Sequence, residues 1–238
     1  MRRLAAAFTA FLLCLTFPTS LSAPPVQAEP MGLVGRASGP YFVNLNSTGM
    51  ILCLVLPEGV PPDTPLSSLT VLQRLQVRVV TGTGSVIGPG RVLTAAHVVE
   101  GAAQCVFQDK PMTPLHFDRA LDLAVLAVPL PTPAQLELHC GGLRRGREYL
   151  GVGWAYGRDF ALQRFTFTGV YADMPLRNAS QPALHQAIMS GEAHSGMSGG
   201  PVLDGAGRVV GVINVGGPGR GGVRDLSQTP LCGEDPSW

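Results

Sequence analysis

Short apolar segments separated by glycine and proline turns recur along most of this chain. The sequence has 238 residues, of which 30 are glycine and 21 are proline. Six such segments follow one another closely, at 75–80, 83–87, 91–94, 104–108, 113–117 and 121–128. A second series lies at 148–152, 163–172, 183–188, 201–203 and 208–215. Strands of this length and spacing indicate an all-β protein built as a barrel or a sandwich.

A proline-rich connection at 129–133 separates the two series of predicted strands. The pattern therefore predicts two small antiparallel β-barrels in tandem. Barrel one is expected at 72–128 and barrel two at 134–226, with a carboxy-terminal tail at 227–238. The only helical pattern is a single turn at 98–102, so strands and turns account for nearly all of the expected structure.

Residues 29–71 precede the regular pattern and are rich in proline, glycine and serine. They contain one convincing strand, expected at 50–56, followed by a stretch rich in turn residues. This composition leaves three interpretations open, namely a pro-segment, an amino-terminal arm packed on the main domain, or a partly disordered linker.

The amino terminus has the pattern of an export signal. Two arginines precede an apolar run at 4–17, and small residues favour cleavage at the Ala28–Glu29 bond. The run is short for a transmembrane span, which needs about 20 apolar residues. An uncleaved anchor at 4–23 is the alternative. The sequence predicts a signal peptide at 1–28 and a secreted or periplasmic protein, attached to a membrane only if that signal is retained.

Four cysteines remain after the signal, namely Cys53, Cys105, Cys140 and Cys232. None of them forms the C-x-x-C spacing that is typical of zinc or redox sites, so disulfides are expected in an oxidising compartment. Four cysteines allow three pairings, which the sequence does not distinguish, and buried free thiols are the alternative. The histidines show no metal-ligand spacing, so neither a metal nor a cofactor is predicted.

The charge balance argues against one class of partner. Charged residues make up 14% of the chain, with 17 basic and 16 acidic side chains. No basic surface for a nucleic acid and no acidic tail is therefore expected.

Three short motifs stand in a fixed order, namely Thr-Ala-Ala-His at 94–97, Asp-Leu-Ala-Val-Leu at 122–126 and Gly-Met-Ser-Gly-Gly-Pro at 196–201. They supply His97, Asp122 and Ser198. A serine hydroxyl needs a base within hydrogen-bond reach, and that base needs an acceptor that fixes its tautomer. Each motif alone is typical of a buried histidine, a turn aspartate or a flexible loop. Together, in this order, they indicate a nucleophilic acyl-transfer site.

The glycines around Ser198 fit the same chemistry. Gly196 and Ser198 can present two backbone N–H groups to a developing oxyanion from one tight turn. Gly199 and Gly200 let the chain leave that turn without a steric clash. The sequence therefore predicts an oxyanion hole formed by Gly196 and Ser198.

These motifs, together with 82–87 (Gly-Thr-Gly-Ser-Val-Ile) and 209–212 (Val-Val-Gly-Val), resemble the trypsin-like serine proteases of the chymotrypsin fold. Among these proteases, the sequence pattern is most similar to the compact bacterial type, which includes glutamyl endopeptidases and the protease domains of HtrA proteins. Unlike HtrA proteins, this chain is not expected to carry a PDZ domain after the protease domain. The resemblance implies two six-stranded antiparallel β-barrels with the active site in the cleft between them. It also implies hydrolysis of a protein or peptide through an acyl-enzyme, in which His97 is the base, Asp122 orients it and Ser198 attacks.

The chain departs from the family pattern beside the nucleophile. Met197 stands where animal digestive relatives carry an aspartate that pairs with a newly freed amino terminus, so activation by that route is not expected. By position, Glu192 falls near the floor of the primary specificity pocket, and Asn214 to Gly216 would form its wall. A buried Glu192 would favour a basic side chain before the scissile bond, whereas His194 would favour an acidic one. The alternative is that both are loop residues facing water.

A second class of function stays open at this point, namely a non-catalytic binding or scaffold protein that retains the double barrel. Met197, the segment at 29–71 and the missing specificity signature favour it. The joint presence of all three triad residues argues against it. The sequence leaves the natural substrate and the oligomeric state undetermined.

Overall fold

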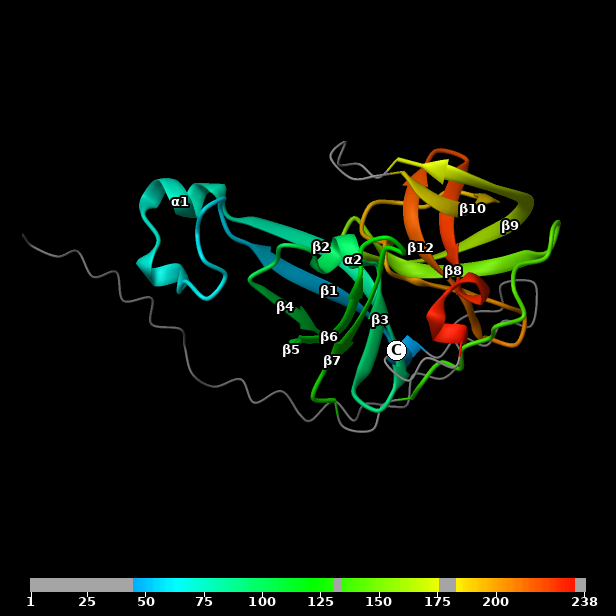
Figure 1. The fold of residues 1–238 in the computed structure, drawn as a ribbon, viewed down its shortest axis with the longest axis horizontal. Helices are drawn as coiled ribbons and strands as arrows, with labels where there is room; N and C mark the ends of the chain where they lie inside the picture. Colours follow the sequence, from blue (N-terminus) through cyan, green and yellow to red (C-terminus); the bar gives the residue numbers. More distant parts are fainter. Residues whose placement is uncertain (1–44, 131–133, 176–182, 234–238) are drawn as a thin grey trace, which may run out of the picture. The chain divides into compact units, whose positions relative to one another are not determined.

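The computed structural model describes residues 45–130, 134–175 and 183–233, which form two antiparallel β-sheets (Figure 1). The strands are β1 (Thr48–Val55), β2 (Arg78–Gly88), β3 (Arg91–Thr94), β4 (Gln104–Phe107), β5 (Lys110–Pro111), β6 (Thr113–Asp118), β7 (Leu123–Ala127), β8 (Glu148–Ala155), β9 (Asp159–Met174), β10 (Leu184–Ser190), β11 (Pro201–Leu203), β12 (Val209–Gly217) and β13 (Arg220–Asp225). The helices are α1 (Val71–Gln76) and α2 (Ala96–Val99), with 3-10 turns η1 (Leu45–Ser47), η2 (Leu66–Ser68), η3 (Leu226–Gln228) and η4 (Pro230–Cys232). The all-β prediction is confirmed.

The first sheet has seven strands in the order β5-β4-β1-β2-β3-β7-β6. Within this sheet, β1 pairs with β2 on one side and with β4 on the other. Sequence reasoning found this strand but placed it in an arm outside barrel one, at 29–71. That boundary is corrected, because the sheet begins at Thr48 and the side chains of Ile51 and Cys53 are buried in its core. The strand β5 lies at one edge of the sheet, is only two residues long and pairs with β4.

A long connection between β1 and β2 explains why the arm looked separate. It carries η2 and α1, which lie at the far end of the β1–β2 hairpin (Figure 1). The strand expected at 75–80 is wrong over its first part, which is helical. Thr70 caps this helix, since its hydroxyl accepts the Gln73 N–H while the Gln73 side chain accepts the Thr70 N–H. This reciprocal capping outweighs the local strand pattern.

The second sheet closes into a six-stranded barrel in the order β10-β13-β12-β11-β8-β9. Five of its strands were predicted, and β13 was missed. This strand contains two adjacent glycines, Gly221 and Gly222, and three charged residues, so it shows no apolar alternation. Backbone pairing with β10 on one side and β12 on the other stabilises β13 as a strand, although its own sequence does not show a strand pattern.

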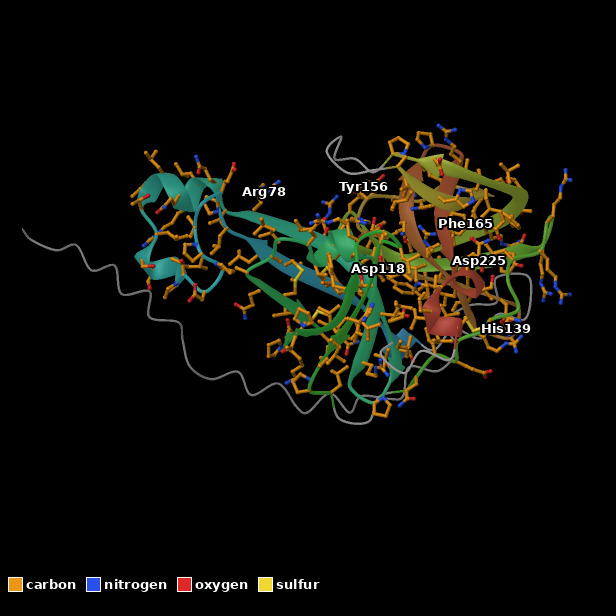
Figure 2. All side chains as sticks on the ribbon, viewed as in Figure 1. Arg78, Asp118, His139, Tyr156, Phe165 and Asp225 are labelled. Carbon is orange, nitrogen blue, oxygen red and sulfur yellow. A yellow bond between two sulfur atoms is a disulfide. The ribbon has the colours of Figure 1, made fainter. Side chains whose placement is uncertain are left out.

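Three hydrophobic clusters lie within the described residues, and the largest contains residues from both sheets. It joins Val92, Leu93 and Leu123 of the first sheet to Val152 and Val212 of the second. The second core fills the closed barrel around Phe165, which is fully buried and labelled in Figure 2. The shared core fixes how the two sheets pack, and so it also fixes the residues at their junction.

Both disulfides expected from the cysteine count are present, and the structure selects one of the three pairings. Cys53 and Cys105 join the neighbouring strands β1 and β4. Cys140 and Cys232 join the start of the second half to the carboxy-terminal turns. The described part of the predicted carboxy-terminal tail, 227–233, contains η4, which this bond attaches to Cys140.

Two findings concern only the parts of the chain that the structure describes. Within these parts, no helix is long and apolar enough to cross a membrane. The same residues contain no group of three metal-ligating side chains gathered around one point. The signal peptide predicted at 1–28 lies outside the described residues.

Candidate active site

His97 and Asp122 form a hydrogen-bonded pair at the edge of the first sheet. The Nδ1 atom of His97 lies 2.8 Å from Asp122 Oδ2, and the His97 backbone N–H donates to Asp122 Oδ1 at 2.8 Å. Asp122 is only 2% exposed. Because a carboxylate accepts hydrogen bonds, this contact places the ring hydrogen on Nδ1 and leaves Nε2 able to accept a proton.

Neighbouring strands bring this pair together. β3 leads through Ala95 into α2, which carries His97, and the paired strand β7 begins directly after Asp122. Asp122 has a left-handed backbone with φ of +52°, a conformation that aspartate adopts more readily than most residues. Asp118, labelled in Figure 2, closes the preceding turn by accepting the Leu121 N–H at 2.8 Å. The turn therefore aims the Asp122 carboxylate at His97.

Ser198 lies on the loop between β10 and β11, which belong to the second barrel. Its carbonyl accepts the Thr83 N–H at 2.8 Å, and the next residue, Gly199, donates to Ile213 O at 2.7 Å. Its hydroxyl makes one hydrogen bond to a described residue, donating to Asn214 O at 3.4 Å. The Ser198 side chain thus points toward β12, and its hydroxyl makes no hydrogen bond to His97 in this structure. Hydrogen bonds of this kind commonly tighten only when substrate is bound.

The turn before Ser198 has the geometry of an anion-binding site. The Met197 N–H donates to His194 O at 3.1 Å, and Gly196 in the third position has φ of +89°. This is a type II turn, which requires glycine there. The central carbonyl of the turn, Ser195 O, accepts the Tyr156 N–H. Because N–H and C=O of one peptide point in opposite directions, this bond turns the Gly196 N–H the other way.

Two backbone donors therefore stand unpaired at this turn. Among the described residues, neither the Gly196 N–H nor the Ser198 N–H has a hydrogen-bond partner. Backbone donors are rarely left without an acceptor in folded proteins. A pair of them beside a serine hydroxyl suits a developing oxyanion.

Thr83 of β2 connects the first sheet to this turn, and sequence reasoning did not single it out. Its hydroxyl is fully buried, donates to Gly196 O at 2.8 Å and accepts the Trp154 N–H at 2.9 Å. Its carbonyl in turn accepts the Thr94 hydroxyl at 2.8 Å. One side chain thus ties β2, β8 and the nucleophile loop together. The glycine-rich segment at 82–87 contains no sequence pattern that would indicate a threonine bridging these three elements.

Replacing this hydroxyl tests the connection. Thr83→Val keeps the shape of the side chain but leaves the Gly196 carbonyl and the Trp154 N–H without a partner. A buried unsatisfied group costs about 1–3 kcal/mol, so we expect the free energy of unfolding to fall by about that amount or more. Urea denaturation measures it. Thr83→Ser retains the hydroxyl and is expected to recover most of the loss; equal losses in both variants would contradict this assignment.

Met197 is a core residue of the second barrel. It is fully buried and packs in the same cluster as Phe165, Val202 and Ile213. Apolar packing therefore occupies the place where digestive relatives use an ion pair. The thioether needs no partner of opposite charge, so apolar contacts hold this side chain in place.

Glu192 and His194 lie together before the turn, but the Glu192 carboxylate is not buried. The Glu192 side chain is 50% exposed, and its Oε1 lies 3.5 Å from His194 Nδ1. That same nitrogen lies 3.2 Å from the hydroxyl of Tyr156, which is labelled in Figure 2. The condition under which Glu192 would select a basic side chain, a buried carboxylate, is therefore not met. The three side chains form a polar cluster instead.

Asn214 and Gly216 lie on β12, and they differ in what they contact. The Asn214 side chain donates to Asp122 O at 3.3 Å, so it faces the triad rather than a pocket wall. Gly216 lies against the backbone of Ala193, and a Cβ atom there would collide with the Ala193 carbonyl. The β12 backbone thus lies beside the chain segment that precedes the nucleophile.

With fold and geometry established, comparison with known proteins defines the class. Residues 82–212 match the family described as the trypsin-like peptidase domain. The chain belongs to this family, and the resemblance inferred from the three motifs is confirmed. All three motif residues, His97, Asp122 and Ser198, lie within the matched segment.

Particular relatives support the same assignment. Serine protease Rv3671c of Mycobacterium tuberculosis is 31% identical over 217 residues, which cover 82% of this chain and 53% of that protein. Protease Do-like 1, chloroplastic, of Arabidopsis thaliana is 24% identical over 85% of this chain and 49% of its own length. This chain thus spans about half the length of the curated relatives it matches.

Solved structures show the same fold. The active form of the Rv3671c protease superposes with a TM-score of 0.61 and 25% identity, covering 78% of this chain and 80% of that chain. The HtrA-type protease AlgW, solved with a decapeptide, gives a TM-score of 0.56 at 20% identity, covering 76% of this chain and 61% of its own. The second similarity, at lower identity, concerns the fold alone.

Proposed function

We propose that this protein is an exported serine endopeptidase that cleaves peptide bonds through an acyl-enzyme. The observation that carries the proposal is the pair in which the buried Asp122 carboxylate accepts the backbone and Nδ1 hydrogens of His97, on a member of the trypsin-like peptidase family. The turn of Gly196 and Ser198 lies across the sheet junction with two free backbone donors. Serine protease relatives support the same class of reaction.

The steps follow from this geometry. His97 Nε2 takes the proton of the Ser198 hydroxyl as that oxygen attacks the substrate carbonyl, and Asp122 stabilises the imidazolium that forms. The Gly196 and Ser198 N–H groups stabilise the negative charge on the substrate oxygen. His97 then gives its proton to the leaving amine, and water repeats the sequence on the acyl-enzyme. Before attack, the Ser198 hydroxyl has to rotate from Asn214 O to His97.

The substrate class in this proposal is a protein or peptide. The Glu192–His194–Tyr156 cluster, with the adjoining β12 backbone at Gly216, is the segment that would contact the side chain before the scissile bond. We also propose a secreted or periplasmic location, on the basis of the apolar run at 4–17 and the small residues before Glu29. The two disulfides support an oxidising compartment.

A fluorophosphonate probe tests the proposal directly, because it reacts only with an activated serine. We expect one equivalent of probe on the exported protein, with the label mapped to Ser198 by peptide mass spectrometry. The intact mass also reads the amino terminus, which is expected to be Glu29. A label on another residue would overturn the choice of nucleophile.

A peptide-library digest separates the enzyme from the non-catalytic alternative. The contact between the Ser198 hydroxyl and Asn214 O, in place of one to His97, adds a structural observation in favour of the non-catalytic double barrel. The proposal expects turnover of at least one peptide, with cleavage sites that share a residue type. Absence of both labelling and turnover in protein whose amino terminus has been verified would favour the binding protein.

A further inference from the structure

A buried arginine contacts the turn that leads into Asp122. Arg224 belongs to β13 and is only 5% exposed. Its Nε–H donates to Leu121 O at 2.9 Å, across the junction of the two sheets. Leu121 directly precedes Asp122, so the guanidinium holds the peptide that enters the aspartate.

The second barrel holds the Asp122 turn at two consecutive carbonyls. Arg224 binds Leu121 O, and Asn214 binds Asp122 O at 3.3 Å. Asp122 has a left-handed backbone, which costs energy for a residue other than glycine and needs support from its surroundings. Asp118 supports the turn from the first sheet. Arg224 and Asn214 supply the support from the other side.

Arg224 is also a buried positive charge. Burial lowers the pKa of its guanidinium, and the nearby carboxylates of Asp122, Asp118 and Asp225 oppose that shift. Among the described residues no ion pair joins Arg224 to any of these carboxylates. Asp225, labelled in Figure 2, is occupied by the Tyr171 hydroxyl at 2.6 Å, and burial raises the pKa of Tyr171. Attraction to these carboxylates, Asp122 among them, thus offsets part of the effect of burial on the Arg224 guanidinium.

We propose that Arg224 is a positioning residue for the catalytic aspartate, which it serves by fixing the Leu121 peptide and by offsetting part of the negative charge beside His97. The inference rests on the proposed function of His97 and Asp122. It goes further by assigning to β13 a part in setting the pH range over which His97 acts as a base.

The direction of the pH effect follows from the charges around His97. Asp122 faces the ring directly, while Asp118, Asp225 and Arg224 lie behind Asp122. Of the elements packed against α2, β1 and β7 carry no titrating side chain, and β2 carries only Arg78, at its far end. On the outer side, Glu100 is paired with Arg119. Removing the Arg224 charge favours the protonated imidazole, so the acidic limb of activity moves to higher pH.

Variants of the full chain separate the two contributions. Arg224→Met removes the charge and the hydrogen bond, Arg224→Gln retains a donor without charge, and Arg224→Lys retains the charge without the planar fork. Arg220→Met, which changes an exposed arginine of the same strand, is the matched control. Comparing the Lys and Gln variants keeps the test decisive if Arg224→Met fails to fold.

We expect kcat to fall about 10–100-fold in Arg224→Met with a KM change under about twofold, because a misplaced aspartate disturbs the reaction more than substrate binding. The acidic limb is expected to move up by about one pH unit in the Met and Gln variants and to stay in place in the Lys variant. If kcat and the acidic limb of Arg224→Met equal those of Arg220→Met, the inference is overturned.

A readout that does not need activity keeps this inference separate from the proposed function. In a Ser198→Ala background, NMR follows the titration of the His97 imidazole with and without Arg224→Gln. An upward shift of the His97 midpoint by about one pH unit supports the inference even if no substrate is cleaved. An unmoved midpoint overturns it even if the protein is an active protease, and a missing fluorophosphonate label on the unmodified protein counts only against the proposed function.

Discussion

Ser198→Ala is expected to lower kcat/KM for a cleaved peptide by about 10⁴-fold or more. Ser198 is the group that would form the acyl-enzyme, and it directly follows the turn that presents the unpaired Gly196 N–H. The residual rate would come from the oxyanion turn and from substrate positioning alone. Initial rates with a peptide identified by the library digest measure this effect.

Ser195→Ala is the matched control for this change. Ser195 lies three residues earlier on the same loop, is exposed, and contributes its backbone carbonyl rather than its hydroxyl to the turn. Its replacement is expected to change kcat/KM by less than about threefold, since surface substitutions of this kind rarely disturb a site. Hydrolysis within tenfold of the unmodified protein by the Ser198→Ala variant would show that another group attacks the substrate.

Asp122→Asn is expected to lower kcat at neutral pH by about 10⁴-fold while leaving the fold intact. The Asp122 carboxylate accepts two hydrogen bonds from His97, one from the backbone and one from Nδ1. An amide has only one acceptor oxygen, so if that oxygen keeps the backbone bond, the NH₂ group faces Nδ1. The imidazole then holds its hydrogen on Nε2, where it cannot take the proton of Ser198.

Asp118→Asn provides the comparison for this second prediction. Asp118 lies on the same turn and accepts the Leu121 N–H through one oxygen, a bond that an amide oxygen can also form. We expect its kcat to stay within a fewfold of the unmodified protein. Similar losses in the two variants would indicate that damage to the turn, rather than the tautomer of His97, causes the effect. Thermal melting and the intact disulfides check that both variants are folded.

The sequence alone was enough to predict those features of the fold and the site that depend on residues close together in the chain. The His97, Asp122 and Ser198 motifs each lie where a strand begins or ends. Short apolar runs correctly predicted most of the strands. Gly196 was identified because a backbone N–H in a tight turn beside the nucleophile suits a developing oxyanion, and the structure shows a left-handed backbone there. These features are encoded within a few residues.

Features that depend on distant contacts were missed or misplaced. β1 was recognised as a strand, but more than twenty residues of turns and helix separate it from its partner β2. β13 has glycines and charges where a strand usually has apolar residues, and only its two neighbours order it. Sequence reasoning did not single out Arg224 for the same reason. A charged side chain in a polar-looking segment gives no local sign that it is buried behind a carboxylate.

The threonine that joins β2 to the nucleophile loop makes catalytic competence a property of the assembled pair of sheets. His97 and Asp122 come from one sheet, Ser198 from the other, and the bonds of Thr83 to Ser198 O and Gly196 O cross between them. Neither half carries a working site by itself. For the proposed protease, we therefore expect specific activity to follow the fraction of molecules in which the two sheets are packed together, and to be lost at the denaturant concentration that opens this junction.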